Sequence, residues 1–293
     1  MGLHEIRVEV NAGCADEIDG VLLELGLACW SLHEDAIAKR AWVVGIFEEE
    51  AEARASWEDL RPLLPGEIPL SPELRPLADR DWRDSYKAHF KPWQFGRLHW
   101  VPVWERETFR APTGDEVLWL DPGLAFGTGN HETTRLCVER LVKLAEGESR
   151  NRVVIDAGCG SGILALSAAL LGFSEVVAFD NDAEAVRVSQ ENAALNNLGG
   201  RVQFLSADLL TGLAGRKAGI LLANIQADVL VRFAAELVAA VAPGGTLVLS
   251  GILAVERDAT RHSFEAVARG WNCESRILGE WSDLMLSRPT AQS

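Results

Sequence analysis

The feature that most constrains the fold is an alternation of short, mostly apolar runs with helix-period segments over the last two thirds of the chain. The runs lie at residues 153–155, 176–179, 202–205, 220–222 and 247–249. Apolar residues at helical spacing lie between them, for example over 163–171 and 182–196. Short apolar strands that alternate with helices are typical of a parallel sheet covered on both faces. The pattern therefore predicts an α/β domain over residues 93–293.

The first 60 residues follow the pattern of a small α+β domain. Ile6, Val8 and Val10 alternate with polar residues, as in a half-buried strand, and apolar residues at helical spacing follow over 15–25. Two β-like runs and a helical segment come next, at 27–32, 41–47 and 48–60, and residues 73–77 can form a last strand. The order β-α-β-β-α predicts a ferredoxin-like split βαβ fold for residues 1–60.

Residues 61–92 are predicted to connect the two domains. Five prolines occur within 61–78, at positions 62, 65, 69, 72 and 76. Proline fixes φ and lacks an N–H donor, so this density suits a connector better than a core element. Residues 79–90 then form a predicted linking helix with aromatic residues at every fourth position, a stripe that we expect to pack between domains.

The charge of the chain argues against one class of partner. The chain has 28 Lys and Arg and 43 Asp and Glu, a formal charge of −15, and the first 60 residues hold 14 acidic and 4 basic residues. Such a chain is repelled by a phosphate backbone, so we expect no direct nucleic-acid binding. A basic protein partner is favoured over a nucleic acid, although by charge alone an acidic surface that only aids solubility is the better explanation.

Three further expectations concern the location of the protein, its thiols and its assembly. No apolar run reaches the length of a membrane span and the N-terminus has no signal-peptide pattern, so we expect a cytoplasmic protein with no membrane contact. The five cysteines form no CxxC pair and no zinc-like spacing, which predicts neither a disulfide nor a metal site. We also expect a monomer.

The strongest local motif is a strand that runs into a glycine turn and then a helix. Residues 153–162 read VVIDAGCGSG, with glycines at 158, 160 and 162. Glycines let the backbone turn sharply and approach a ligand closely, so Gly158 and Gly160 are candidate cofactor-binding residues. The dinucleotide fingerprint G-x-G-x-x-G has its third glycine one position later, which favours a nucleotide-like cofactor without a pyrophosphate. An unliganded tight turn is the alternative.

Polar residues at the ends of three further strands complete the candidate site. Asp180 ends the next strand, where a carboxylate can accept hydrogen bonds from ribose hydroxyls; the alternative is a cap for the following helix. Asp208 can accept from an adenine amino group, and an N-cap role explains it equally well. Asn224 follows the fourth strand, and its amide can both accept from an amine and donate to a second group. By itself Asn224 would be interpreted as a turn residue.

A second segment, residues 120–134, reads LDPGLAFGTGNHETT, rich in glycine and hydroxyl groups and placed just before a helix. Thr133 or Thr134, near the helix start, can bind a cofactor carboxylate with help from the positive end of the helix. The glycines suggest a loop that closes over the site. His131 is a candidate general base, although a single loop histidine is more often structural.

These residues resemble those of class I S-adenosylmethionine-dependent methyltransferases, specifically the ribosomal protein methyltransferase A family, which modifies large-subunit ribosomal protein eleven. The resemblance covers residues 81–93, 120–134, 155–165, 179–182, 223–225 and 249–253. It is most specific in the loop DPGLAFGTG at 121–129.

The resemblance implies a Rossmann-like, seven-stranded α/β methyltransferase domain that binds S-adenosylmethionine through Thr134, Gly158, Asp180 and Asn224. It also implies that the N-terminal domain recognises the protein substrate and swings on the linker. The sequence departs from the family pattern at Asn130 and Glu132, which flank the loop histidine, and at Gln226, beside the presumed amine site.

The motifs together with the resemblance imply a protein N-methyltransferase in which Asn224 orients a neutral amine of ribosomal protein eleven, a lysine, the N-terminal amine or both. Orientation is the main requirement of an in-line displacement, so no strong base is needed. Three alternatives stay open. They are a methyltransferase acting on another lysine or a small amine, a dinucleotide-dependent oxidoreductase, and a non-catalytic ribosome-assembly protein.

Overall fold

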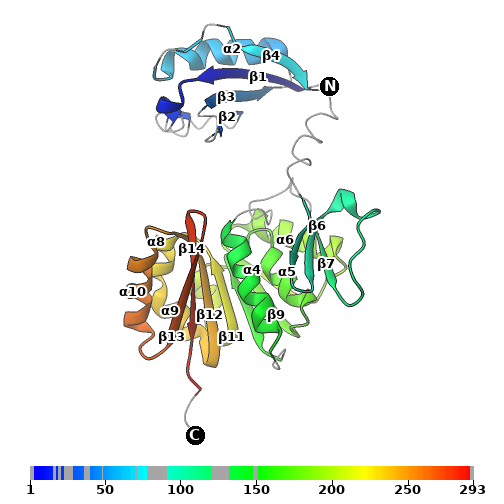
Figure 1. Ribbon diagram of the computed structural model, residues 1–293, viewed down its shortest axis with the longest axis vertical. Helices are drawn as coiled ribbons and strands as arrows, with labels where there is room; N and C mark the ends of the chain where they lie inside the picture. Colours follow the sequence, from blue (N-terminus) through cyan, green and yellow to red (C-terminus); the bar gives the residue numbers. More distant parts are fainter. Residues whose placement is uncertain are drawn as a thin grey trace. The chain divides into compact units, whose positions relative to one another are not determined.

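The computed structural model describes residues 3–15, 18, 21–22, 29–35, 40–47, 49–66, 68–69, 71–77, 91–120, 132–147 and 151–290. The chain divides into two compact units, Met1–Phe90 and Lys91–Ser293 (Figure 1).

The C-terminal unit is built on a seven-stranded sheet, as expected. Its strands are β8 (Val153–Ala157), β9 (Glu175–Asp180), β10 (Gln203–Ser206), β11 (Ala218–Asn224), β12 (Val241–Leu253), β13 (Asn272–Leu278) and β14 (Trp281–Ser287). Their order is β10-β9-β8-β11-β12-β14-β13. The first five are parallel and β14 is antiparallel to both of its neighbours. The α/β prediction is confirmed, while the closing β13–β14 hairpin was not expected.

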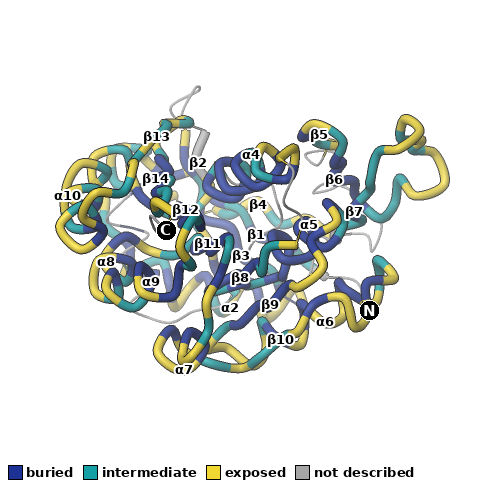
Figure 2. The backbone as a smooth tube through the Cα atoms, turned by 90° about the horizontal axis from the view of Figure 1, so that it is seen from below, coloured by how far each residue is buried: buried dark blue, intermediate teal, exposed yellow. Residues whose placement is uncertain are grey.

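Helices cover both faces of this sheet. They are α4 (Glu132–Ala145), α5 (Ile163–Leu170), α6 (Ala183–Leu195), α7 (Leu209–Leu213), α8 (Ala227–Arg232), α9 (Ala234–Ala240) and α10 (Arg257–Val267). Successive strand residues enter different cores: Ile220 and Leu222 lie in the core with α4 and α5, and Leu221 lies in the core with α9. Buried strands with exposed outer helix surfaces are visible in Figure 2.

The strand order has a topological switch point beside β8. From β8 the chain passes outward to β9 and β10, and it then returns to β11 on the other side of β8. Loops that leave the carboxyl ends of β8 and β11 therefore run in opposite directions. In open α/β sheets ligands bind at such a switch point.

A smaller three-stranded sheet precedes the main one. It consists of β5 (Trp93–Phe95), β6 (Leu98–Pro102) and β7 (Glu116–Leu120), in that order. Trp100 packs in the core of α4 and α5, and its Nε1 donates to Ser167 Oγ on α5 at 2.9 Å. This sheet therefore fixes the segment from which residues 121–131 depart.

The N-terminal unit has an antiparallel sheet of order β2-β3-β1-β4, as the ferredoxin-like prediction requires. Its elements are β1 (Leu3–Val10), β2 (Trp30–Asp35), β3 (Arg40–Phe47), α2 (Glu50–Leu60) and β4 (Glu73–Leu77). Of the helix predicted over 15–25, the four described residues are helical, and Ile18 and Leu22 are buried.

The boundary predicted at residue 60 is too early. β4 pairs with β1 from Leu3↔Leu77 to Arg7↔Glu73, which places the proline-rich segment up to residue 77 within the N-terminal unit. Proline is tolerated there because β4 is an edge strand. The predicted linking helix at 79–90 lies outside the described residues.

The face of the N-terminal sheet opposite the core has a concave site. Val8 and Val43 enter the core, so the alternate residues Arg7 and Trp42 lie on the other face. A cavity of about 410 Å³ is lined there by Arg7, Val8, Glu9, Arg40, Trp42, Pro69, Ser71 and Glu73. The guanidinium carbons of Arg7 and Arg40 lie 4.3 and 4.8 Å from the Trp42 ring centroid.

None of the helices that the structure describes has the length and apolar character needed to cross a lipid bilayer. Within the described ranges, no three His, Cys, Asp or Glu side chains are grouped so as to hold a metal ion. All five cysteines are free thiols.

Candidate active site

Four of the predicted site residues come together at the carboxyl edge of the sheet. Gly158 directly follows β8, Asp180 ends β9, Asn224 ends β11, and Thr134 lies in the first turn of α4. Asn224 Nδ2 donates to Thr134 Oγ1 at 3.3 Å, so two residues 90 positions apart in the chain are in contact. This edge includes the switch point between β8 and β11.

The glycine turn has a backbone that only glycine adopts easily. Gly158, Gly160 and Gly162 have φ of 74°, 52° and 76°. The amides of Gly158 and Cys159 donate to the Phe179 carbonyl at 2.9 and 3.0 Å, which ties the turn to the end of β9. The turn is therefore held by hydrogen bonds within the protein.

Helix α6 supports this turn through two buried polar side chains that the sequence analysis missed. Ser189 Oγ donates to the Gly160 carbonyl at 2.8 Å, and Asn192 Nδ2 donates to the Ser161 carbonyl at 2.9 Å. The signal that marks them is their position on the apolar side of a predicted helix, where a polar residue needs a partner.

Asp180 is oriented by two backbone amides. Its Oδ2 accepts from Gly160 N at 2.9 Å and its Oδ1 from Asp182 N at 3.0 Å. Each carboxylate oxygen has a second lone pair, so the side chain can still accept from ligand hydroxyls. The alternative role of helix cap is wrong for Asp180, because Asp182 is the N-cap of α6 and accepts from Glu184 N at 2.9 Å.

Asp208 has the capping role that the sequence analysis left open. It is the N-cap of α7, and its Oδ1 accepts from the amide and hydroxyl of Thr211 at 2.7 and 2.6 Å. The hydrogen bond from the Thr211 hydroxyl lowers the pKa of this carboxyl below its usual value. A contact with adenine stays a prediction, and it requires the same side chain to serve both purposes.

The first turn of α4 is held against the end of the sheet. Thr133 and Thr134 are buried, and Ser250 Oγ on β12 donates to the Thr133 carbonyl at 3.0 Å. His131 and the glycine-rich loop at 121–131 lie outside the described residues, so the general-base candidate and the closing loop stay predictions.

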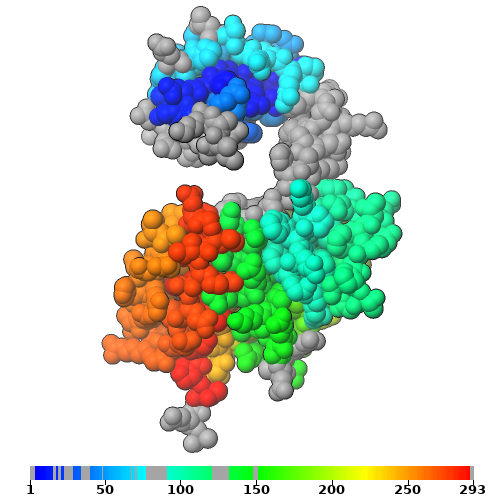
Figure 3. All heavy atoms as spheres, in the orientation of Figure 1, coloured from blue at the N-terminus to red at the C-terminus, as the bar shows by residue number. Residues whose placement is uncertain are grey.

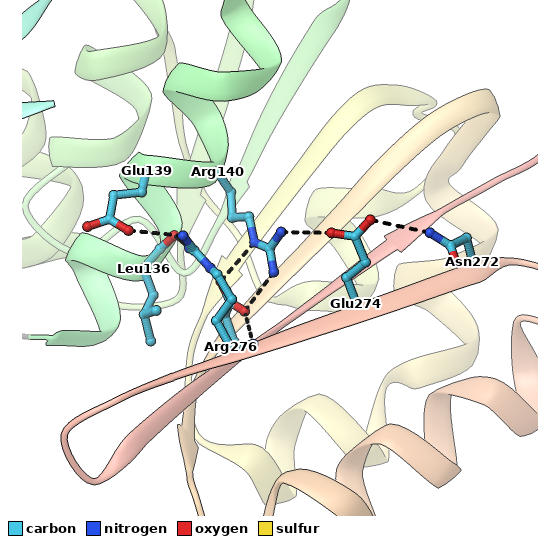
Figure 4. Close-up of polar contacts among 7 residues, drawn as sticks. Leu136, Glu139, Arg140, Asn272, Glu274 and Arg276 are labelled. Carbon is cyan, nitrogen blue, oxygen red and sulfur yellow. Dashed lines mark hydrogen bonds and ion pairs between the residues drawn. The ribbon is translucent and has the colours of Figure 1, made fainter. Parts of the chain in front are cut away.

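A buried ionic network fixes α4 to the β13–β14 hairpin (Figure 4). Asp283 is fully buried and accepts from the guanidinium groups of Arg140 on α4 and Arg276 on β13, at 2.7–3.1 Å. Arg276 also donates to Glu139 Oε2 at 2.9 Å. Figure 3 shows α4 (green) beside the last strands (red) on one face of this unit.

Comparisons with known proteins agree on one family. The family model described as ribosomal protein L11 methyltransferase (PrmA) matches residues 5–289. A protein named ribosomal protein L11 methyltransferase from Pelobacter propionicus is 38% identical over 305 aligned positions, 97% of each chain. One of the same name from Trichlorobacter lovleyi is 44% identical over 230, covering 77% of this chain and 74% of its own.

A solved structure of a ribosomal protein L11 methylase from Lactobacillus delbrueckii subsp. bulgaricus is 30% identical, with a TM-score of 0.60, and covers 68% of this chain and all of its own. The chain belongs to the ribosomal protein L11 methyltransferase family. Membership confirms the resemblance and the predicted class of enzyme, an S-adenosylmethionine-dependent methyltransferase. The dinucleotide-dependent oxidoreductase is thereby excluded.

This member of the L11 methyltransferase family also has a buried acid that the sequence analysis did not single out. Asp156 on β8 is 1% exposed; its Oδ2 accepts from Ala165 N at 3.1 Å, and its Oδ1 has no partner among the described residues. Burial raises the pKa of its carboxyl to about 7. Burial also raises the pKa of the neighbouring Cys159 thiol, so this cysteine is not a reactive thiolate.

Proposed function

We propose that the chain transfers methyl groups from S-adenosylmethionine to amino groups of ribosomal protein L11, at lysine side chains, the N-terminal amine or both. The observation that carries the proposal is the arrangement at the switch point. A glycine turn held by Asp180 lies on one side of it, and the Asn224–Thr134 pair lies on the other. A switch point of this kind offers one place where a methyl donor and an amine acceptor can meet.

The residues present fit this cofactor. The positive-φ turn, which has no Cβ atoms at its glycines, lets the backbone lie close to a ligand, and Asp180 has free lone pairs for two ribose hydroxyls. We assign Gly158, Gly160 and Asp180 to the adenosine part, Asp208 to the adenine amino group and Thr134 to the carboxylate. The cofactor supplies a methyl group on a positively charged sulfur.

Asn224 is placed to orient the acceptor. Its Nδ2 is engaged by Thr134 Oγ1, which leaves Oδ1 to accept a hydrogen bond from the amine. An amine aligned in this way directs its lone pair along the line of displacement. The lysine proton leaves to water, and desolvation of the ammonium as it enters the site lowers its pKa and favours this loss.

Replacing Asn224 tests this role. Asn224→Ala should lower kcat by up to about 100-fold, because a misplaced reacting group loses near-attack geometry. The measurement is the initial rate of methyl transfer at saturating cofactor, with affinity for S-adenosylhomocysteine measured by calorimetry. His131→Ala is the comparison, and it should retain activity because no base is required. An unchanged rate in Asn224→Ala removes the residue from the mechanism; loss of activity in His131→Ala with intact affinity makes the histidine a base.

The substrate is tested by incubation with purified ribosomal protein L11 and cofactor, followed by intact-mass measurement. Increments of one methyl group are expected. A second candidate function, methylation of another lysine or a small amine, requires the same assay with those acceptors. Absence of transfer to every acceptor would favour a non-catalytic role.

We further propose that the acidic N-terminal unit recognises the basic protein substrate and that residues 78–92 act as the linker. The enzyme is proposed to act in the cytoplasm as a monomer without binding nucleic acid directly. Light scattering of the purified chain tests whether it is a monomer. Gel-shift titration with ribosomal RNA tests whether it binds nucleic acid directly.

A further inference from the structure

The turn that follows Asn224 lies between two glycines: Gly158, directly after β8, and Gly251, within β12. At Gly158, a Cβ atom would lie 2.5 Å from Ile225 Cγ2. At Gly251, a Cβ atom would lie 2.4 Å from the Ile225 carbonyl oxygen and 2.8 Å from its carbonyl carbon. Ile225 therefore has its side chain against the cofactor turn and its backbone against β12.

An irregularity in β12 produces the second contact. The pairing of β12 with β14 shifts register between Leu249 and Ile252, and Gly251 has φ of 81°. Ser250, which pairs with Asn224 in the parallel register, donates to the Thr133 carbonyl on α4. The irregularity thus directs Ser250 to α4 and Gly251 to Ile225, in the manner of bulges that re-aim residues near active sites.

We propose that Ile225, held by Gly158 and Gly251, sets the distance between the reactive carbon of the cofactor and the acceptor amine, with Gly251 as the positioning residue. The inference rests on the proposed function. Ile225 is the residue after Asn224, which orients the amine, and its side chain contacts the turn that binds the cofactor. A shift of Ile225 therefore moves Asn224 relative to the cofactor turn. In-line displacement is sensitive to such changes in the position of the reacting groups.

A glycine that merely adopts positive φ would behave differently, and the chain has a matched control. Gly270 has φ of 79°, close to the 81° of Gly251, but no atom lies within 4 Å of its Cβ position. Alanine at residue 270 therefore introduces backbone strain alone. Alanine at residue 251 introduces the same strain and also displaces Ile225.

The first experiment compares Gly251→Ala with Gly270→Ala by kcat, by calorimetric affinity for S-adenosylhomocysteine, and by amide hydrogen exchange at residues 224–227. Gly251→Ala should lose about 100-fold in kcat, far more than in affinity, and should exchange faster at the turn. Gly270→Ala should match the wild type in all three. Equal kcat in the two variants, or a loss of kcat no larger than the loss of affinity, overturns the proposal.

The second experiment does not depend on the folding of Gly251→Ala. Ile225→Ala deletes the side chain that contacts the turn at Gly158 and leaves both glycines and the backbone contact at Gly251 in place. It should lower kcat by more than it lowers affinity for S-adenosylhomocysteine, because the spacing between the cofactor turn and Asn224 is lost. A wild-type kcat in Ile225→Ala, or a loss of kcat no larger than the loss of affinity, overturns the proposal.

Failure of the proposed function can be told apart from failure of the positioning role of Gly251. If the wild-type enzyme does not methylate ribosomal protein L11, the proposed function fails, and hydrogen exchange at residues 224–227 still tests the contact. If the wild type is active and Gly251→Ala equals it, the positioning role alone fails.

Discussion

Asp180 shows how a single side chain serves both the fold and the proposed site. Its two oxygens accept from the amides of Gly160 and Asp182, so the carboxylate shapes the turn to which the cofactor is proposed to bind. An amide in its place has one acceptor oxygen and one NH₂ group, and that NH₂ group faces an N–H donor. Substitution therefore disturbs the turn as well as the ribose contact.

Asp180→Asn should weaken S-adenosylhomocysteine binding by about 10- to 100-fold, since a hydrogen bond to a charged group contributes about 1.5–3 kcal/mol. Isothermal titration calorimetry measures the affinity of each variant for S-adenosylhomocysteine. Asp182→Asn is the matched control, because asparagine caps a helix as well as aspartate and affinity should not change. Equal affinities in the two variants would contradict the role of Asp180.

The buried carboxyl of Asp156 should make the stability of the protein depend on pH. Burial raises the pKa of its carboxyl in the folded protein to about 7, from an ordinary value of 3.8, so the folded protein holds a proton that the unfolded chain releases. The resulting stability is fully present below about pH 4 and is lost as pH rises through 7. Asp156→Asn keeps an oxygen for Ala165 N and cannot titrate. Urea unfolding from pH 4 to 8 should show the wild type losing stability relative to this variant; parallel curves would refute the assignment.

At the scale of elements, α4 illustrates how the site depends on distant packing. The helix presents Thr134 to Asn224 at one end, and Arg140, two turns further on, pairs with Asp283 between α4 and the β13–β14 hairpin. The hairpin sequences are rich in polar residues, so hydrophobic alternation did not reveal them as strands. Their buried charges are compensated across elements.

Asp283→Asn should lower the free energy of unfolding by about 3–5 kcal/mol, the usual effect of removing one partner of a buried ion pair. Two guanidinium groups would lose their carboxylate. Glu191→Gln breaks an exposed pair with Arg187 on α6 and should have no measurable effect. Urea unfolding of both variants checks this, and similar stabilities would show that the network contributes little.

At the scale of the whole molecule, the proposed division of labour assigns the protein substrate to the N-terminal unit. Its sheet face opposite the core has a concave site in which two arginines stack on Trp42 and two carboxylates, Glu9 and Glu73, line the same cavity. Tryptophan and arginine are the residues most enriched at the centres of protein interfaces. Under this proposed division, a change in this surface alters the binding of the protein acceptor and not that of the cofactor.

Trp42→Ala should raise KM for ribosomal protein L11 by about tenfold, the effect of losing a contact worth more than 1 kcal/mol. It should leave kcat and affinity for S-adenosylhomocysteine unchanged. Arg54→Ala, on the exposed side of α2, is the control within the same unit and should leave KM, kcat and affinity for S-adenosylhomocysteine unchanged. Steady-state kinetics with the intact substrate measures KM and kcat. Equal KM values for Trp42→Ala and Arg54→Ala would exclude this face as the substrate-binding surface.

Much of the architecture could be predicted because it depends on short-range patterns. Apolar runs separated by helical periods indicate a covered parallel sheet wherever they occur. Prolines were misleading over 61–77, since an edge strand does not need every N–H and β4 tolerates Pro76. The β5–β7 sheet and the β13–β14 hairpin were missed because neither fits the alternation.

The amino-acid sequence by itself determined the sheet-and-helix alternation, the glycine turn and the strand-end position of Asp180, because backbone preference and hydrophobic period act within a few residues. Only the tertiary structure decided that Ser189 holds the turn, that Asp283 joins α4 to the last strands, and that Ile225 lies between Gly158 and Gly251. Those contacts join segments far apart in the chain. They exist only when strand order and register are set by the packing of the whole unit.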